Sequence, residues 1–263
     1  MKREQTHAGR RALVTGAGQG VGRAIALRLA EAGAEVMVND LTANRADAVV
    51  AEITAAAGSA VTAAFDVTDW HAVQAWAASS PRVDIVVNNA GNAGRAAALT
   101  RDDFAPFAET EPPEWEPFLR VNLYGVMYVV RAVLPGMVGG RYGRIVTVIS
   151  DAGRVGEPMM AAYSAAKAGA AGFMRAVARE VGRHGITANC VSLGTIDATE
   201  GHGAGLASPE QAEAAQRALS RYVIRRPGRP DDAAPLVALL TGPEAGWITG
   251  QTYPVNGGYS FAV

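Results

Sequence analysis

The stretch Ala161–Gly169 carries a phenol and an amine, Tyr163 and Lys167, among small side chains. Residues four positions apart lie on one face of a helix, so the lysine ammonium can approach the phenol oxygen. An ordinary tyrosine has a pKa of about 10 and is a poor base near neutral pH. A neighbouring cation favours the phenolate and lowers that pKa. The pair therefore predicts a general acid and base that a lysine tunes.

A glycine-rich loop, TGAGQGVG at residues 15–22, joins a short apolar run to a helical pattern. Its spacing is Gly16-x-x-x-Gly20-x-Gly22. It is not G-x-G-x-x-G, because Val21 stands where that pattern needs glycine, and no Gly-Lys-Ser/Thr of a Walker loop follows. Glycines allow a tight turn, and a helix N-terminus offers N–H groups to a phosphate. The loop predicts a dinucleotide site; the alternative is a glycine-rich turn without a ligand.

Asp40 closes the next apolar run and is followed by Leu41 rather than by a basic residue. A carboxylate at this position can accept hydrogen bonds from the adenosine ribose, and it repels a 2′-phosphate. We therefore expect NAD as the cofactor in preference to NADP. The alternative is an acidic residue that only starts a turn.

The elements that must position these groups alternate along the whole chain. Strand-like runs lie at 11–16, 35–40, 60–66, 83–91, 144–150, 185–192 and 251–258, and helical patterns follow most of them, among them 115–134, 162–182 and 231–240. Nearly all-apolar strands that alternate with helices predict a parallel sheet covered on both faces. We expect an α/β protein with one doubly wound Rossmann domain over residues 1–263 and about seven parallel strands. Residues 1–9 are expected to form a flexible tail and residues 197–222 a substrate lid.

Over nearly its whole length the chain resembles the short-chain dehydrogenase/reductase family. The resemblance rests on an ordered series of motifs: the glycine loop with Thr15, Asn88-Asn89-Ala90-Gly91, Asn122, Ser150, Tyr163-x-x-x-Lys167 and the closing ITGQTYPVNGG. It implies that Tyr163 is the general acid/base and that Lys167 lowers its pKa and holds the nicotinamide ribose. It also implies that Ser150 donates a hydrogen bond to the substrate oxygen and that Asn122 belongs to a water relay. Ser150 could instead cap a strand end or helix, and Asn122 could only bond backbone.

The same resemblance implies a set of cofactor contacts from the loops at the strand ends. These are Gly16, Gln19, Gly20, Val21, Gly22, Asp40, Leu41, Asp66, Val67, Asn89, Ala90, Gly91, Tyr163, Lys167, Gly194 and Ile196. Asp66 could equally start the next turn. The chain departs from the family at Leu193, where relatives usually carry proline, and we expect a less rigid turn there. Ala198 fills the position in which relatives carry threonine, and Thr199 comes next.

Composition excludes several other classes of function. Lys plus Arg (24) nearly balances Asp plus Glu (25), so we expect no nucleic-acid partner. The single cysteine, Cys190, excludes an intramolecular disulfide, and the four histidines lack metal-ligand spacing, so no metal is expected. The polar start does not resemble a signal peptide, and no stretch of about 18 residues is expected to span a bilayer. We therefore expect a cytoplasmic protein without a membrane partner.

These observations predict an oxidoreductase that moves a hydride between NAD(H) and a secondary alcohol or ketone. Two stretches, TEPPEWEPFLRVNL and VISDAGRVGEP, are similar to relatives that oxidise hydroxyacyl-CoA thioesters and to 3-oxoacyl-carrier-protein reductases. An acyl thioester substrate and an NADPH-dependent reductase activity therefore stay open, as does a dinucleotide-binding sensor without turnover. We expect a homotetramer, because relatives commonly pack the helices near 115–134 and 162–182 against symmetry mates.

Overall fold

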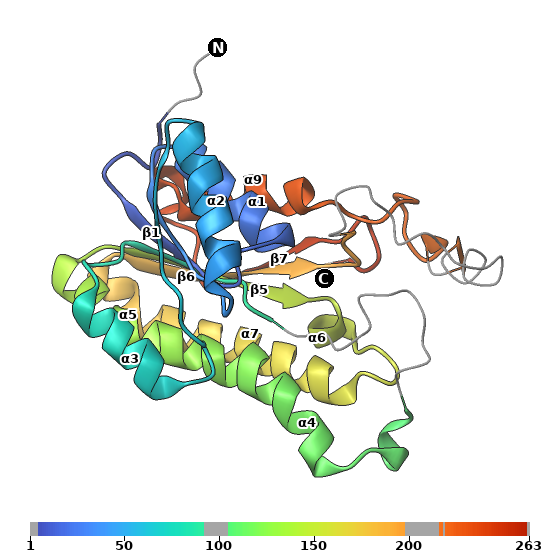
Figure 1. Ribbon diagram of the computed structural model, residues 1–263. Helices are drawn as coiled ribbons and strands as arrows, with labels where there is room; N and C mark the ends of the chain where they lie inside the picture. The colour runs from blue at the N-terminus through green and yellow to red at the C-terminus, as the bar shows by residue number, and fades with distance from the viewer. Residues whose placement is uncertain (1–4, 92–104, 198–215, 218, 262–263) are drawn as a thin grey trace.

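The computed structural model describes residues 5–91, 105–197, 216–217 and 219–261 (Figure 1). Seven parallel strands form one sheet in the order β3-β2-β1-β4-β5-β6-β7. Their bounds are β1 Arg11–Val14, β2 Glu35–Val38, β3 Ser59–Thr62, β4 Ile85–Asn88, β5 Gly143–Ser150, β6 Ile186–Leu193 and β7 Thr252–Val255. The expected doubly wound fold is confirmed, and most expected strands are correct to within two or three residues.

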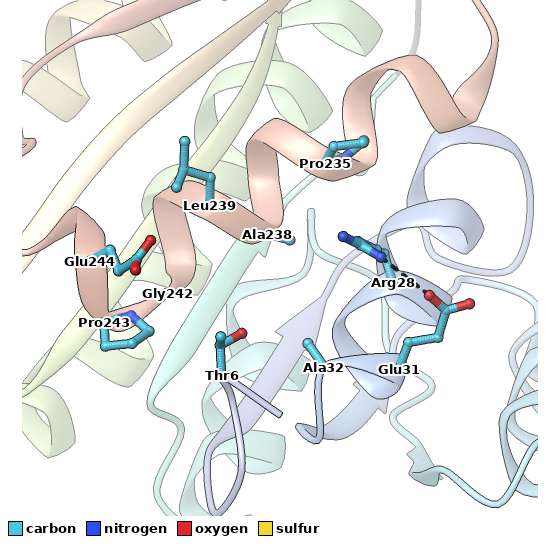
Figure 2. A pocket seen from close by; sticks show the side chains of 10 residues that line it. All are labelled: Thr6, Arg28, Glu31, Ala32, Pro235, Ala238, Leu239, Gly242, Pro243 and Glu244. Atoms are coloured by element: carbon cyan, nitrogen blue, oxygen red, sulfur yellow. Dashed lines mark hydrogen bonds and ion pairs between the residues drawn. The ribbon is translucent and has the colours of Figure 1, made fainter. Parts of the chain in front are cut away.

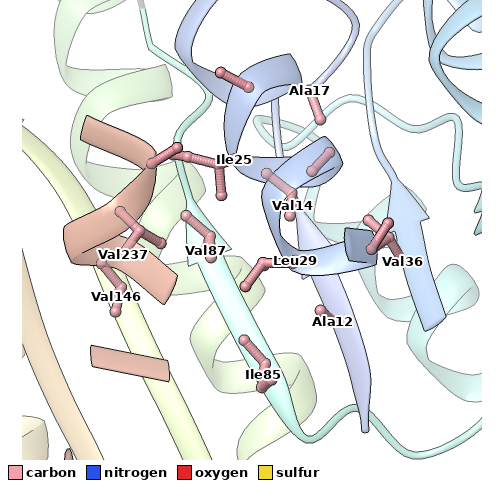
Figure 3. Close-up of a cluster of buried hydrophobic side chains, with 14 of the residues drawn as sticks. Ala12, Val14, Ala17, Ile25, Leu29, Val36, Ile85, Val87, Val146 and Val237 are labelled. Carbon is pink, nitrogen blue, oxygen red and sulfur yellow. The ribbon is translucent and has the colours of Figure 1, made fainter. Parts of the chain in front are cut away.

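Helices cover both faces of this sheet (Figure 1). One face carries α1 Gly20–Glu31, α2 Ala43–Ala55 and α9 Pro230–Thr241; the other carries α3 Trp70–Ser79, α5 Gly125–Gly140 and α7 Ala161–Val181, and α4 Pro112–Leu119 packs against α7. Each face has its own core of buried aliphatic side chains. Figure 3 shows the first core, in which Ile25 and Leu29 of α1 meet Val237 of α9 above the strands.

Strand order reverses its direction at β1, because β2 pairs with one edge of β1 and β4 with the other. The loops after β1 and β4 therefore leave the sheet toward opposite faces, and a crevice opens between them. The glycine loop follows β1 and the Asn89–Gly91 loop follows β4, so the fold brings both to this point. Ser150 and Leu193 end the neighbouring strands β5 and β6 side by side.

The expected single helix at 115–134 is longer and is divided by a π-helical turn, Arg120–Tyr124, between α4 and α5. The side-chain amide of Asn122 donates to the Phe118 carbonyl at 3.0 Å, the acceptor that its own N–H would use in an α-helix. The ladder then shifts by one residue, and the Gly125 N–H donates to the Arg120 carbonyl. Such turns are rare and are frequent at functional sites.

The described part of the expected tail, residues 5–9, packs against the domain instead of standing free. His7 is buried, its Nε2 lies 3.0 Å from the Thr241 hydroxyl at the end of α9, and its N–H donates to the Ala32 carbonyl. Burial lowers the pKa of His7, and the charge of Arg28 lowers it further. The prediction of a flexible tail is therefore wrong for these residues, because it rested on local polarity and could not include partners far along the chain.

One helical stretch among the described residues, Pro112–Gly140, is long and apolar enough by composition to cross a membrane, with a mean hydropathy of 1.4 over a window of 18 residues. The expectation that the chain holds no such stretch is thus wrong. The apolar residues of α5 have another explanation, because Val126, Val129, Val130, Val133 and Met137 are buried in the second core. Their composition serves packing against the sheet.

Cys190 lies in the middle of β6, opposite Thr147 of β5, and is 1% exposed. Burial raises the pKa of its thiol to about 12. It behaves as a small core side chain, as expected for a lone cysteine in an apolar strand.

Candidate active site

The glycine loop is built so tightly that side chains do not fit at its key positions. Gly16 adopts a φ of +60°, and a Cβ there would lie 2.8 Å from the Ala90 Cα. A Cβ on Gly22 would lie 2.2 Å from the Gly16 carbonyl oxygen. Both spacings are shorter than real Cβ contacts, so the two glycines are required for the loop to close on α1. Gln19 occupies the N-cap of α1 and makes no side-chain cap there, and Gly20 and Val21 begin the helix.

Thr15 and Asn89 tie this loop to the loop after β4. The Thr15 hydroxyl accepts hydrogen bonds from the N–H groups of Asn89 and Ala90, both at 3.0 Å. The Asn89 amide donates in return to the carbonyls of Thr15 and Gly16, also at 3.0 Å. The two loops that border the crevice therefore form one rigid unit.

Asp40 lies buried beside the glycine loop. Its Oδ2 accepts from the Gly18 N–H at 3.2 Å and its Oδ1 from the Thr42 N–H at 2.9 Å, while Arg45 Nη1 lies 4.0 Å from Oδ1. Gly18 is required for this contact, because a Cβ there would lie 2.6 Å from Asp40 Oδ2. A carboxylate has about four acceptor positions, so capacity for a ribose hydroxyl is left. Leu41, next to it, is 74% exposed.

Asp66 and Val67 end the segment after β3. The Asp66 carboxylate accepts from the Thr68 N–H at 2.8 Å, so it does start a turn, as the alternative interpretation had it. Val67 is buried against Gly125, where a Cβ would lie 3.0 Å from its side chain. Any contact of Val67 with a cofactor would therefore come from its backbone.

Ser150 and Tyr163 meet at the carboxyl end of β5. Ser150 is the last residue of the strand, and its Oγ accepts from the Ala152 N–H at 3.2 Å. Tyr163 lies in the first turn of α7, with the Phe118 ring packed edge-on at 6.3 Å between centroids. Burial raises the pKa of Tyr163, and a hydrogen bond with the Ser150 side chain lowers it in part. The expected lowering by Lys167 is not found: burial and the Ser150 hydrogen bond are the causes of the shift.

Lys167, Asn122 and Gly91 gather behind the phenol. Lys167 Nζ lies 5.9 Å from the centre of the Tyr163 ring and donates to the Val148 carbonyl at 3.0 Å. A Cβ on Gly91 would lie 2.9 Å from Asn122 Oδ1 and 3.3 Å from Lys167 Nζ, so both polar groups converge on this glycine. Burial lowers the pKa of Lys167 to about 8. Burial of the charged ammonium therefore costs folding free energy.

The turn after β6 carries Gly194 and Ile196. Tyr222 holds this turn, since its hydroxyl accepts from the Thr195 N–H and donates to Thr195 Oγ1, both at 2.9 Å. The Gly228 N–H donates to the Thr195 carbonyl at 2.9 Å, and Ile196 forms a β-bridge with Gly228. These long-range bonds fix the turn without the missing proline. Residues 198 and 199, and the expected lid from 198 to 215 and at 218, lie outside the described residues.

The described residues fit a nicotinamide dinucleotide. The glycines at the start of α1 leave no room for side chains, and the first turn of this helix has neither a side-chain cap nor an acidic residue. Its N–H groups can therefore meet a pyrophosphate. Asp40 contacts the glycine loop, Asn89 joins that loop to the loop after β4, and Lys167 lies at Gly91 of the same loop.

Several residues that build the site escaped the sequence analysis. Gly18 was passed over within the glycine pattern, and Asn39, Asp151 and Tyr222 were not singled out. The Asn39 amide donates to the carbonyls of Ala63 and Phe65 and so holds the segment after β3 in place, where a longer strand was expected. Position at a strand end beside a recognised motif was the one available signal for Asn39 and Asp151.

A cavity of about 310 Å³ lies elsewhere, between the N-terminal segment, α1 and α9 (Figure 2). The Arg28–Glu31 ion pair and Leu239 line it, and none of the expected site residues does. It is therefore separate from the chemistry of the crevice.

Comparison with known proteins agrees with this geometry. The sequence profile of a family described as short chain dehydrogenase matches residues 10–206. The chain is 38% identical over 255 residues to a 3-oxoacyl-[acyl-carrier-protein] reductase of Synechocystis sp., covering 94% of this chain and 95% of that protein. It is 38% identical over 253 residues to the (2S)-[(R)-hydroxy(phenyl)methyl]succinyl-CoA dehydrogenase subunit BbsD of Thauera aromatica, covering 95% and 96%.

Solved structures share the fold. A crystal structure of a 3-oxoacyl-[acyl-carrier protein] reductase with bound NAD from Brucella melitensis superposes with a TM-score of 0.86 at 33% identity. The match covers 99% of this chain and 95% of that chain.

Proposed function

Since the chain belongs to the short-chain dehydrogenase family and is therefore an oxidoreductase with a nicotinamide dinucleotide cofactor, we propose that it interconverts a secondary alcohol and a ketone with NAD(H). The observation that carries this proposal is the meeting of Ser150, Tyr163 and Lys167 beside the crevice of the glycine loop. When bound, the dinucleotide accepts or supplies the hydride. The protein moves the proton and orients the substrate oxygen.

Tyr163 exchanges the proton with the substrate oxygen. In oxidation its phenolate removes the hydroxyl proton, and in reduction its hydroxyl donates a proton to the oxygen that forms. Ser150 donates a hydrogen bond to the same oxygen and fixes its distance from the phenol. The positive charge of Lys167 stabilises the phenolate of Tyr163. Asn122 lies beside Lys167 at Gly91 and would bind the water that exchanges protons with Lys167.

We propose NAD in preference to NADP. The support is the buried carboxylate of Asp40 beside the glycine loop, which would repel a 2′-phosphate, and Arg45 lies 4.0 Å from this carboxylate. The alternative is an NADPH-dependent 3-oxoacyl reductase activity, for which Arg45 would have to turn to the phosphate. A thermal-shift comparison decides between them: at equal concentration NADH should raise the melting temperature more than NADPH does. A larger shift with NADPH would contradict the assignment of Asp40.

The substrate class is proposed to be a hydroxyacyl or oxoacyl thioester. Its support is the pair of relatives named as a 3-oxoacyl-[acyl-carrier-protein] reductase and a (2S)-[(R)-hydroxy(phenyl)methyl]succinyl-CoA dehydrogenase subunit, both aligned over nearly the whole chain. A panel of 3-hydroxyacyl-CoA thioesters and simple secondary alcohols, followed by NADH absorbance, tests it. Equal turnover of both groups would remove the thioester preference, and tight NADH binding without turnover of any substrate would favour a sensor.

We further propose a cytoplasmic homotetramer. Exposed large apolar side chains in two separate places support it, as a D2 assembly requires two kinds of interface. Tyr124 of the π-helical turn and Met127 of α5 are exposed. Trp247 is 98% exposed and precedes the edge strand β7. Light scattering at micromolar concentration should give four times the monomer mass of 27.2 kDa.

A further inference from the structure

Asp151 directly follows Ser150 and is 2% exposed, yet the chemistry above does not use it. Its carboxylate is the most heavily bonded acidic group near the site. Oδ1 accepts from Ser192 Oγ at 2.6 Å and from Arg154 Nη1 at 3.0 Å. Oδ2 accepts from Asn256 Nδ2 at 2.5 Å and from Ser260 Oγ at 2.7 Å. Four donors thus fill the four acceptor positions of a carboxylate.

These four donors come from segments far apart in the chain. Ser192 lies in β6 immediately before the turn of Gly194 and Ile196. Arg154 lies in α6 Ala152–Val155, and Asn256 and Ser260 lie in the C-terminal turn after β7. Asp151 also extends the β5–β6 pairing, because its N–H donates to the Leu193 carbonyl at 2.9 Å. One buried charge therefore joins the ends of two central strands to the end of the chain.

Each joined segment touches the proposed reaction centre. Ser150 Oγ is held by the Ala152 N–H, on the other side of Asp151. The α6 turn packs on Lys167, since a Cβ on Gly153 would lie 2.7 Å from the Lys167 Cβ. Asn256 packs against the turn after β6, because a Cβ on Gly194 would lie 3.2 Å from the Asn256 Cα.

We propose that Asp151 is a positioning residue: with the C-terminal turn Asn256–Ser260, it sets the distance between Ser150 and the turn at Gly194, and so between the substrate oxygen and the nicotinamide. The inference rests on the proposed function. It goes beyond that function, because it assigns the turn Asn256–Ser260 a role in positioning the active-site residues. An ordinary structural aspartate would affect stability alone.

The test is Asp151→Asn, with Asp84→Asn as the matched control. Asp84 is also buried and accepts from Arg82 Nη2 and the Arg11 N–H, but it lies at the opposite end of the sheet. In each variant the asparagine NH2 faces a hydrogen-bond donor that the carboxylate accepted from. Both variants therefore lose buried hydrogen bonds and should melt at a lower temperature. Asp151→Asn should lower kcat by about tenfold to a hundredfold, the effect of a misplacement near 1 Å. Asp84→Asn should keep kcat within about twofold.

Two further readouts separate positioning from folding. The dissociation constant of NADH, followed by its fluorescence, should change much less than kcat in Asp151→Asn, because the hydrogen bonds of the Gly16–Gly22 loop and of Asp40 do not involve Asp151. The pH profile of oxidation should move to higher pH, since a displaced Ser150 no longer lowers the Tyr163 pKa while Lys167, the charged group facing the phenol, is unchanged. If Asp151→Asn does not fold, Ser260→Ala replaces it, with an expected loss of about threefold in kcat.

Equal kcat in Asp151→Asn and Asp84→Asn, or an unchanged kcat in Ser260→Ala, would overturn the inference while the proposed function stands. A wild-type chain that binds NADH but turns over no substrate would instead remove the proposed function, and the inference with it.

Discussion

In the proposed mechanism Tyr163 exchanges the proton, so its protonation state affects the rates of oxidation and of reduction in opposite ways. Burial raises its pKa and Ser150 counteracts part of this effect, so the phenol is mostly protonated near neutral pH. Oxidation needs the phenolate and reduction needs the phenol. We therefore expect kcat/KM for alcohol oxidation to rise toward alkaline pH and kcat/KM for ketone reduction to fall there. Initial rates in both directions across pH 6–10 would check this; a reductive rate that rises with pH would contradict it.

Tyr163→Phe removes the exchangeable proton and little else, because the ring keeps its contact with Phe118. We expect a loss of about a hundredfold to ten-thousandfold in kcat, the usual share of general acid–base catalysis. The melting temperature and the NADH affinity should be nearly unchanged. A variant with full turnover would remove Tyr163 from the mechanism.

Lys167 lowers the stability of the folded protein while it serves the proposed reaction. Its pKa in the folded protein, about 8, lies below its ordinary value of 10.5, so the unfolded chain binds the proton more tightly. This group therefore costs stability at neutral pH, and the cost is relieved as pH rises from about 8 to 10.5. Lys167→Met should raise stability at pH 7 by ~1–2 kcal/mol while abolishing most turnover. Chemical unfolding at pH 7 measures it, and a less stable variant would argue against the buried charge.

At the scale of elements, the glycine loop and α1 act as one rigid support. Gly22→Ala should push the loop off the helix, since its Cβ would meet the Gly16 carbonyl. We expect NADH affinity to fall by at least tenfold, and calorimetry would measure the change. The matched control is Gly139→Ala in α5, where a Cβ meets nothing within 4 Å and helix propensity should even stabilise the chain. Equal NADH affinity in the two variants would contradict the role of the loop.

Local pattern was enough to predict the strands and the placement of most site residues. β5 and β6 are nearly all-apolar because both faces of the sheet are covered, and this reads directly from the sequence. The glycine spacing and the i, i+4 pair also act within one element. Such features depend on neighbours a few positions away.

What could not be predicted depends on contacts across the chain. The π-helical turn is accompanied by a side-chain bond of Asn122, and His7 is held by a partner more than 200 residues away in the sequence. The same holds for Asp151, whose donors at Ser192 and Ser260 no spacing rule connects. Polar residues that look like surface or turn residues acquire their roles only when the sheet is assembled.

At the scale of the whole molecule, Trp247 is the most conspicuous side chain outside the core. Its indole is 98% exposed next to an edge strand, and we propose that it lies in the second interface of the proposed tetramer. Trp247→Ser should therefore convert tetramers into dimers at micromolar concentration, seen by light scattering, while the fold by circular dichroism stays unchanged. A tetramer that persists in this variant would place the second interface elsewhere.

The single buried thiol has a practical consequence for the whole sheet. Cys190 lies within β6, and its side chain is buried in the core between the sheet and α7, so an alkylating reagent can react with it only after this core opens. The labelling rate under native conditions therefore reports how often α7 separates from the sheet. No engineered probe is needed, because the chain holds no other cysteine to compete for the reagent.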